Sequence, residues 1–254
     1  MSGVYLCTHR HQKVNHMRVI LFDIDGTLVA KRSTQADERE RFKRAVLDVT
    51  GRSPPMEPWR YDGMVDPEIC RRLLLEVGLS SDAASEHLQR VIFRAGEIYL
   101  AGKKRPILND GVGDLLRILS ASSGHKLGVL TGNLSTVAEE KLRMTGIRRY
   151  FAETFCSNGY FDRADLVRDA VSACVRKYRL RANGDVTIVG DTPRDVEAAN
   201  ANAARVLAVA SGFYSVSELR AAGATLVFPN LRPSNELLAA LGSESYQRAQ
   251  ARKP

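Results

Sequence analysis

Residues 19–29, VILFDIDGTLV, decide the fold of this chain. The apolar run at residues 19–22 is typical of a strand that is buried on both faces of a parallel sheet. Because side chains alternate along a strand, Asp23 and Asp25 would point to the same side, and Gly26 then permits a sharp turn. Two neighbouring carboxylates repel each other unless a cation or a shared proton lies between them. The segment predicts a strand that ends in a reactive site, although Asp and Gly are also common in ordinary turns.

Two later segments repeat this pattern. Residues 126–133, KLGVLTGN, are predicted to form a second buried strand that ends in a hydroxyl group and a glycine. Residues 186–195, VTIVGDTPRD, are predicted to form a third strand that ends in two acids. Helices are expected between the strands, and one of them begins near Ser135. This alternation predicts an α/β fold, a doubly wound Rossmann-like parallel sheet whose strand ends share one crevice.

The three strand ends, taken in order, resemble the motifs of the haloacid dehalogenase superfamily of phosphotransferases. Residues 23–27, DIDGT, match its first motif, D-x-D-G-T. Thr131 matches the second motif, and residues 190–195, GDTPRD, match the fourth, G-D-x-x-x-D. Each motif alone is weakly specific for the family, but the presence of all three in the family's order is a strong indication. The resemblance covers residues 17–233 and is strongest to phosphoglycolate phosphatases and β-phosphoglucomutase-like enzymes.

The third motif of the family is a Lys or Arg before a helix. Arg163 is assigned to it because this residue opens the helix that precedes the third quoted strand. The Lys-Pro form that is common in the family is absent, so Arg168 and Lys177 are kept as alternatives. An arginine at a helix start is also often a solvated surface residue.

The resemblance implies different roles for the two acids of the first motif. Asp23 would attack phosphorus and become an aspartyl-phosphate, which divides a slow hydrolysis into two easier displacements. Asp25 would protonate the leaving oxygen and then take a proton from the attacking water. That role calls for a raised pKa, and the charge of the neighbouring acid pushes the pKa of Asp25 upward. Thr131 and Arg163 would hydrogen-bond the transferring phosphoryl group.

The resemblance also implies Mg²⁺ as the cofactor. Mg²⁺ prefers hard oxygen ligands and retains several waters, which suits the carboxylates of Asp23 and Asp191 and the backbone carbonyl of Asp25. Asp195, one helical turn further, would support the ion through water or from behind its ligands. In the alternative interpretation, Asp191 and Asp195 are first-turn helix acids and Thr131 is a turn or capping residue.

Further substrate contacts are expected on loops. Backbone N–H groups around Gly26 and Gly132, with Asn133 beside them, would donate to the phosphate. The Pro-rich segment at residues 54–66 would face the core site, and its Arg60 is the candidate for a second anionic group on the substrate.

Residues 33–105 do not alternate strand with helix. Apolar stripes predict three helices, over residues 37–50, 66–75 and 83–100. The second would begin with Asp66 as its cap. A helical insertion just after the first strand resembles the cap of one large branch of the family, a lid that excludes water and contacts the substrate beyond the phosphate. The core would then comprise residues 17–32 and 106–241.

The composition agrees with a soluble enzyme. The chain has 254 residues, 44% of them hydrophobic, and no apolar run reaches the length of a membrane span. Four cysteines without metal-ligand spacing indicate reduced thiols in a cytoplasmic protein. The formal charge of +8 favours anionic ligands, but basic and acidic residues are interspersed, which argues against a nucleic-acid groove. Residues 1–16 are expected to be a disordered extension, with Met17 as a possible start of translation, and residues 242–254 a frayed tail.

These observations favour a Mg²⁺-dependent phosphatase that acts on a small phosphorylated metabolite. A phosphomutase of the β-phosphoglucomutase type would keep the same residues but must shield the aspartyl-phosphate from water. Haloacid dehalogenation is disfavoured because relatives with that activity lack the second carboxylate, here Asp25. A catalytically silent phosphate-binding protein would not need every acid of the reaction.

Overall fold

The structure is a computed structural model that describes residues 17–55, 61–102 and 105–242 and, within these, the side chains of all but residues 32–37. Three features predicted from the sequence lie outside the described residues: the extension at residues 1–16, Arg60, and the tail after residue 242. Within the described part of the chain, no helix is both long and apolar enough to cross a membrane.

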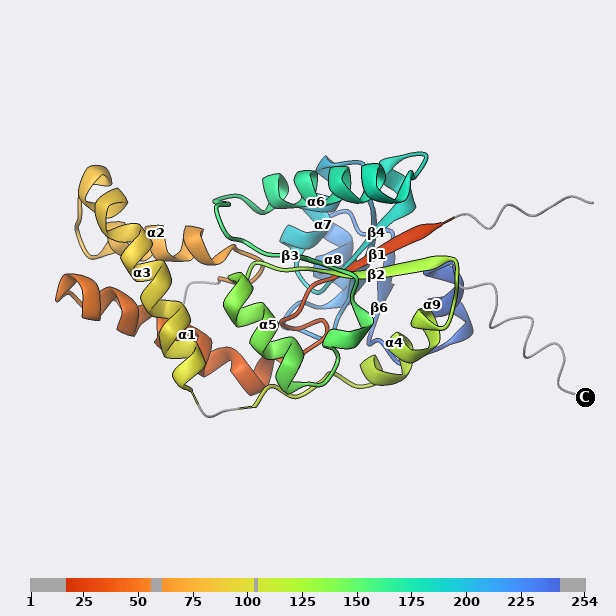
Figure 1. Ribbon diagram of the computed structural model, residues 1–254, viewed down its shortest axis with the longest axis horizontal. Helices are drawn as coiled ribbons and strands as arrows, with labels where there is room; N and C mark the ends of the chain where they lie inside the picture. Colours follow the sequence, from red (N-terminus) through yellow and green to blue (C-terminus); the bar gives the residue numbers. More distant parts are fainter. Residues whose placement is uncertain (1–16, 56–60, 103–104, 243–254) are drawn as a thin grey trace, which may run out of the picture.

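A six-stranded parallel sheet forms the centre of the core (Figure 1). Its strands are β1 (Arg18–Phe22), β2 (His125–Leu130), β3 (Glu153–Phe155), β4 (Val186–Gly190), β5 (Arg205–Val209) and β6 (Leu226–Phe228). They lie in the order β3-β2-β1-β4-β5-β6, so β1 pairs with β2 on one side and with β4 on the other. The sheet therefore brings the ends of the three predicted strands next to one another, at the point where the strand order reverses.

Helices cover both faces of this sheet. The core helices are α4 (Val112–Ser120), α5 (Ser135–Met144), α6 (Arg163–Tyr178), α7 (Pro193–Ala201), α8 (Val216–Ala221) and α9 (Asn235–Ala240). Ile20 and Phe22 of β1 pack with α4, α5 and α9, whereas Val19 and Leu21 pack with α6, α7 and α8. Alternate residues of one strand thus enter two separate apolar layers, which explains why β1 is apolar at every position. The predicted fold class is confirmed.

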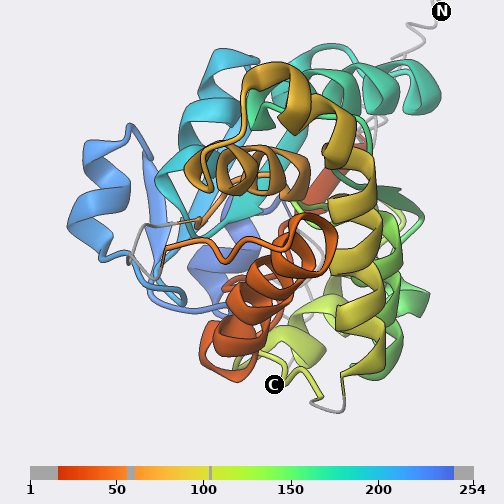
Figure 2. The same cartoon turned by 90° about the vertical axis from the view of Figure 1, so that its left-hand side faces the viewer.

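Three further helices lie at one end of the core (Figures 1 and 2). They are α1 (Lys31–Thr50), α2 (Asp66–Glu76) and α3 (Ser81–Ala101). They enclose an apolar cluster of their own, with Phe42, Leu73 and Val91 among its buried members. These helices form the cap. The first of them begins at Lys31, earlier than the predicted residue 37, so the chain enters the cap almost directly from the loop after β1.

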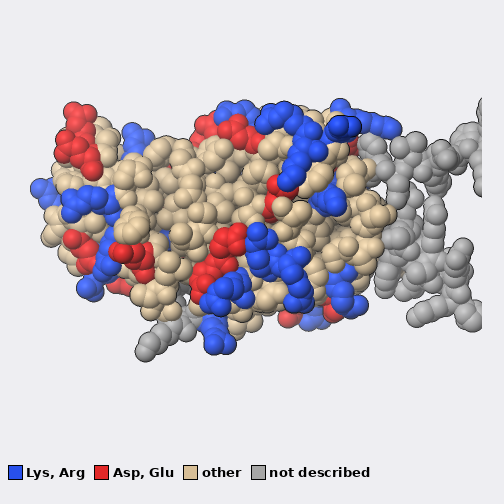
Figure 3. Space-filling model, in the orientation of Figure 1, with Lys and Arg blue, Asp and Glu red and all other residues tan. Residues whose placement is uncertain are grey.

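Basic and acidic side chains are mixed on the face shown in Figure 3. Many exposed arginines pair with acids one helical turn away, as Arg143 does with Glu140 and Arg168 with Asp165. Pairs of this kind contribute little to stability, and they leave this face without a continuous basic stripe.

Candidate active site

The chain turns sharply after β1. Asp23 still belongs to the sheet, because its N–H donates to the carbonyl of Val189 in β4 (2.9 Å). Gly26 then adopts a φ of +93°, and its N–H donates to the carbonyl of Val29 (2.7 Å). A Cβ atom at Gly26 would lie only 2.1 Å from Asp191 Oδ2. Glycine is required here both for the left-handed backbone and for the close approach of Asp191.

Three buried carboxylates gather at the ends of β1 and β4. Asp23, Asp191 and Asp195 each offer one oxygen, and these oxygens lie within 4.8 Å of one another. Asp191 Oδ1 accepts from Thr27 (3.2 Å), whereas its buried Oδ2 has no hydrogen-bond partner among the described residues. Burial raises the pKa of Asp191 well above its usual range; Lys31 opposes the shift, and the two neighbouring acids add to it. A hard divalent cation such as Mg²⁺ fits this donor set, because it would relieve the repulsion and occupy the unpartnered oxygen.

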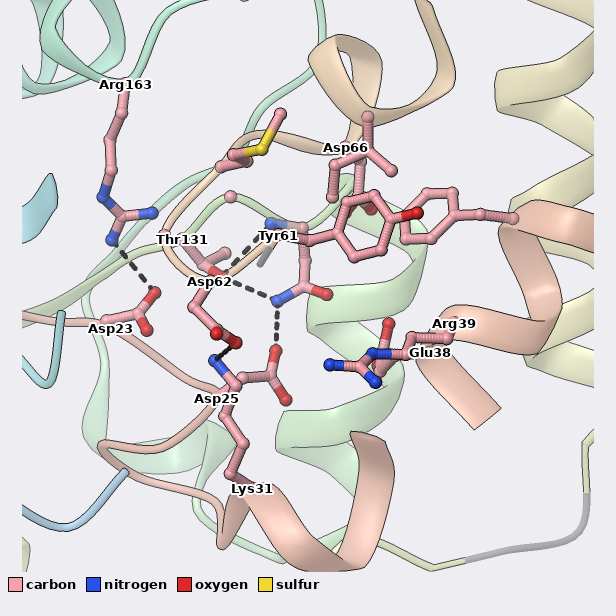
Figure 4. Close-up of a pocket in the computed structure, with 16 residues that line it drawn as sticks. Asp23, Asp25, Lys31, Glu38, Arg39, Tyr61, Asp62, Asp66, Thr131 and Arg163 are labelled. Carbon is pink, nitrogen blue, oxygen red and sulfur yellow. Dashed lines mark hydrogen bonds and ion pairs between the residues drawn. The ribbon is translucent and has the colours of Figure 1, made fainter. Parts of the chain in front are cut away.

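Arg163 lies against this cluster, and Figure 4 shows its guanidinium beside Asp23. Its side chain is 5% exposed, and its Nη2 donates to Asp23 Oδ1 (3.2 Å) and to Asp195 Oδ1. The two alternatives for the third motif, Arg168 and Lys177, are exposed and pair with surface carboxylates. Of the three candidates, the structure therefore places Arg163 beside the first motif.

Asp195 has two functions in the fold. Its Oδ2 accepts from the N–H (3.0 Å) and the hydroxyl (2.7 Å) of Thr192, which forms a capping box at the start of α7. Its Oδ1 holds Arg163. It is therefore both a first-turn helix acid and a member of the site.

Burial raises the pKa of Asp23 to about 6, an effect that Arg163 opposes and that Asp195 and Asp25 strengthen.

Asp25 does not have the raised pKa that the sequence analysis expected. Its Oδ2 accepts from Lys141 Nζ (2.7 Å) and from Asn133 Nδ2 (2.7 Å). Burial alone would raise the pKa of Asp25, but the charge and hydrogen bond of Lys141, helped by Asn133, more than offset it and the net shift is downward. The expectation was wrong because it considered only the neighbouring acid, whereas a lysine on α5 contacts the carboxylate directly.

The loop after β2 connects these groups. Thr131 is fully buried and lines the pocket, and its Oγ1 accepts from Asn133 Nδ2 (2.8 Å). Since Asn133 also donates to Asp25, one amide links the second motif to the first. Gly132 lies against the cap, where a Cβ atom would come within 2.3 Å of the carbonyl oxygen of Met64. This loop is therefore part of the site and also the place where the cap meets the core.

The pocket lies between core and cap and measures about 90 Å³. Its cap side is formed by Lys31, Glu38, Arg39, Phe42, Tyr61, Asp62, Met64, Asp66 and Ile69. Lys31 pairs with Asp62 (2.9 Å). Arg39 points from α1 toward the pocket (Figure 4), and no hydrogen bond or ion pair ties its guanidinium to another described residue. Arg60, the predicted contact for a second anionic group, lies outside the described residues, but Arg39 offers the same charge.

Asp66 begins α2 without capping it, contrary to the sequence-based expectation. The cap position is Val65, whose side chain makes no capping hydrogen bond. The Asp66 carboxylate instead accepts from Arg41 Nη2 at both oxygens (3.0 and 2.9 Å) and from the N–H of Leu134 (3.0 Å). Arg41 is 1% exposed, so this ion pair is buried and fixes the start of α2 against the core loop.

Sequence analysis missed Lys141, Lys31 and Arg39. Lys141 follows Glu139 and Glu140 and therefore resembles part of a solvated charged face. One signal was available, because Lys141 lies four residues after Val137 and so falls on the apolar stripe of its helix. A lysine on a buried stripe needs a buried carboxylate.

The comparisons with known proteins agree with this site. The family model for haloacid dehalogenase-like hydrolases matches residues 17–202. The chain belongs to this family. The match spans the first, second and fourth motifs, and the predicted hydrolase class is confirmed.

Individual relatives are distant. A 5'-nucleotidase from Pseudomonas aeruginosa is 29% identical over 210 residues, which cover 80% of this chain and 86% of that protein. Among solved structures, a predicted phosphoglycolate phosphatase from Haemophilus somnus matches with a TM-score of 0.62 at 20% identity, covering 85% of this chain and 95% of that one. CbbY from Rhodobacter sphaeroides, solved with xylulose-(1,5)bisphosphate, matches with a TM-score of 0.65 at 19% identity, covering 86% and 96%. At these identities the structural matches support the fold.

Proposed function

We propose that the protein is a Mg²⁺-dependent phosphatase that hydrolyses a small phosphate monoester through an aspartyl-phosphate on Asp23. The observation that carries this proposal is the cluster of Asp23, Asp191 and Asp195 around a buried, unpartnered oxygen, with Arg163 on one side. When bound there, Mg²⁺ would screen the charge between the attacking carboxylate and the phosphate. Asp23, Asp191 and the backbone carbonyl of Asp25 would hold it, with Asp195 and Arg163 behind them.

The protein groups then divide the reaction in two. In the first half, an oxygen of Asp23 bonds to phosphorus while the bond to the ester oxygen breaks, and Asp25 gives that oxygen a proton. In the second half, Asp25 takes a proton from water, whose oxygen attacks phosphorus and releases Asp23 and phosphate. The entering phosphate dianion would raise the pKa of Asp25 and so favour the proton needed for the first half. Thr131 and Arg163, with backbone N–H groups near Gly26 and Gly132, would hold the phosphoryl oxygens.

The size of the pocket favours a small substrate. One water needs about 10–15 Å³ of such space, so a cavity of about 90 Å³ holds about six to nine waters. Room for several waters agrees with a small phosphate ester. Arg39 on the cap side would bind a carboxylate or a second phosphate on such a substrate. Phe42 and Tyr61 would cover its carbon skeleton.

Phosphate release from p-nitrophenyl phosphate and from a panel of small phosphate esters tests this proposal. We expect turnover that is lost on chelation with EDTA and restored by Mg²⁺. The Asp23→Asn variant should be at least about 10³-fold slower in kcat while keeping its fold. Activity of a purified Asp23→Asn protein near that of the wild type would refute the assignment of the nucleophile. Isomerised sugar phosphate without free phosphate would instead indicate a mutase.

A further inference from the structure

Lys141 is a fully buried cation that contacts both the core and the cap. Its side chain is fully buried, although α5 begins at the protein surface next to the site. An ammonium group has three N–H donors. Two oxygens accept hydrogen bonds from Lys141 Nζ, Asp25 Oδ2 (2.7 Å) and Asn133 Oδ1 (3.0 Å). Glu38 Oε1 forms an ion pair with the same nitrogen at 2.5 Å, without the geometry of a hydrogen bond.

These partners of Lys141 come from both parts of the protein. Asp25 and Asn133 belong to the core loops, whereas Glu38 lies on α1 of the cap. The ring of Tyr99, on α3 of the cap, lies 5.3 Å from Lys141 Nζ and covers it from another side. The cation therefore occupies a site that is complete only while the cap lies against the core.

Lys141 makes more polar contacts than the neutralisation of a buried ammonium group requires. One carboxylate would suffice to neutralise a buried ammonium. Here Asp25, which carries the proton in the proposed reaction, is held on one oxygen by Lys141 and Asn133 together, and Asn133 is itself held by Lys141. Two donors on one oxygen fix the rotation of the carboxylate, and the Lys141 ammonium also forms an ion pair with Glu38 of the cap.

We propose that Lys141 is a positioning residue that holds the Asp25 carboxylate in the orientation needed for proton transfer, and that Glu38 makes this orientation depend on a closed cap. The inference rests on the function proposed above. With the cap closed, Lys141 contacts Asp25, Asn133 and Glu38, and Asp25 is held in place. With the cap open, Lys141 loses Glu38 and Tyr99 and is exposed to water, so Asp25 is held less firmly. Proton transfer is then efficient only in the closed, water-excluding state.

The dependence of the rate on the leaving group tests this role. p-Nitrophenolate leaves without protonation, whereas the alkoxide of an alkyl phosphate needs a proton from Asp25. For Lys141→Met, which removes the charge and keeps the length of the side chain, we expect kcat/KM on 2-hydroxyethyl phosphate, which reports the first half of the reaction, to fall about 10²-fold or more. On p-nitrophenyl phosphate kcat/KM should fall less than about fivefold, whereas kcat should fall on both esters because Asp25 also takes the proton from water. Glu38→Gln should show the same selectivity to a smaller degree, and Arg71→Gln, an exposed change on α2, should show neither effect.

The possible outcomes separate the explanations. Equal losses of kcat/KM on both esters in variants that keep the wild-type circular dichroism and melting temperature would mean a merely structural role, and would overturn the inference. If Lys141→Met does not fold, Glu38→Gln decides, because it leaves the core contacts of Lys141 in place and changes only the contacts of Glu38 with Lys141 and with Arg41. Equal rates of Glu38→Gln and wild type on the alkyl ester would overturn the link to the cap. A wild-type protein that releases phosphate from neither ester would refute the proposed function itself.

Discussion

Arg41→Met should be among the most destabilising substitutions in the cap, although it removes a cation from a basic protein. The Arg41 guanidinium is 1% exposed, bonds both oxygens of Asp66 and the carboxylate of Glu38 (2.7 Å), and lies over the ring of Phe42 (3.9 Å). Methionine fills part of the volume but leaves Asp66 as a buried charge. Because removal of one partner from a buried ion pair costs about 3–5 kcal/mol, we expect a loss in this range.

The expected loss lies near the lower end of that range. Asp66 keeps its hydrogen bond from the N–H of Leu134, and Glu38 keeps Lys141. We therefore expect a loss of about 3 kcal/mol in the free energy of unfolding, a large part of the ~5–15 kcal/mol typical of a domain. Urea unfolding followed by circular dichroism measures it, with Arg71→Met as the exposed control, which should change stability by less than about 0.5 kcal/mol.

A double variant provides the decisive comparison. In Arg41→Met with Asp66→Asn, no isolated charge is buried, and the amide oxygen still accepts from Leu134. We expect the pair of changes to restore at least about 1 kcal/mol relative to Arg41→Met alone. A single variant that loses less than about 1 kcal/mol, or a double variant that loses the sum of both single changes, would contradict this account of the buried pair.

Two further outcomes are expected. Arg39→Gln should lower kcat/KM for 2-phosphoglycolate about tenfold or more, because the variant loses the charge-assisted pair with the carboxylate of that substrate. For 2-hydroxyethyl phosphate, which has no carboxylate, kcat/KM should stay within about twofold of the wild type. Equal effects on both esters would exclude Arg39 from substrate recognition. Burial lowers the pKa of His125, whose Nε2 lies 3.1 Å from the carbonyl oxygen of Leu241. The folded state therefore binds fewer protons than the unfolded chain, and stability should fall as the pH decreases below about 6.5. His125→Gln should reduce that fall between about pH 7 and 5.5 in urea titrations, and an unchanged slope would exclude His125 as its source.

The strands could be predicted because their signals are local. Residues 19–22, 126–130 and 186–190 are apolar runs that end in polar turns, and the structure contains a strand at each. The helices of the cap were also predictable from their apolar stripes. The start of α1 at Lys31 was not predicted, because it depends on a loop that leads directly from the first motif into the cap. The helix α2 begins at Asp66 as predicted, but a distant arginine holds Asp66 there and the residue does not act as a cap.

Sequence patterns located the site residues whose type the proposed chemistry requires. They did not locate the residues whose role depends on a contact between distant segments of the chain. Asp23, Asp191 and Asp195 lie together as the motif order suggested. The partners of Asp25 could not be deduced, because 116 residues separate it from Lys141 and the two meet only once β2 pairs with β1. The pKa of Asp25 is lowered by its contacts with Lys141 and Asn133, which the motif alone does not reveal.

The cations around the first motif explain why Asp23 and Asp25, two acids of the same motif, lie in different electrostatic environments. Lys141 and Asn133 hold the Asp25 carboxylate directly, so the net charge around Asp25 is balanced by the protein itself. Asp23 and Asp195 share the contact with Arg163, and Asp191 lies beside them with an oxygen that has no hydrogen-bond partner among the described residues. The negative charge that the protein leaves uncompensated therefore lies on the side of Asp23 and Asp191, where burial raises both pKa values. In the function proposed above, a divalent cation would be held on that side, beside Asp23, whereas the Asp25 carboxylate contacts Lys141 and Asn133.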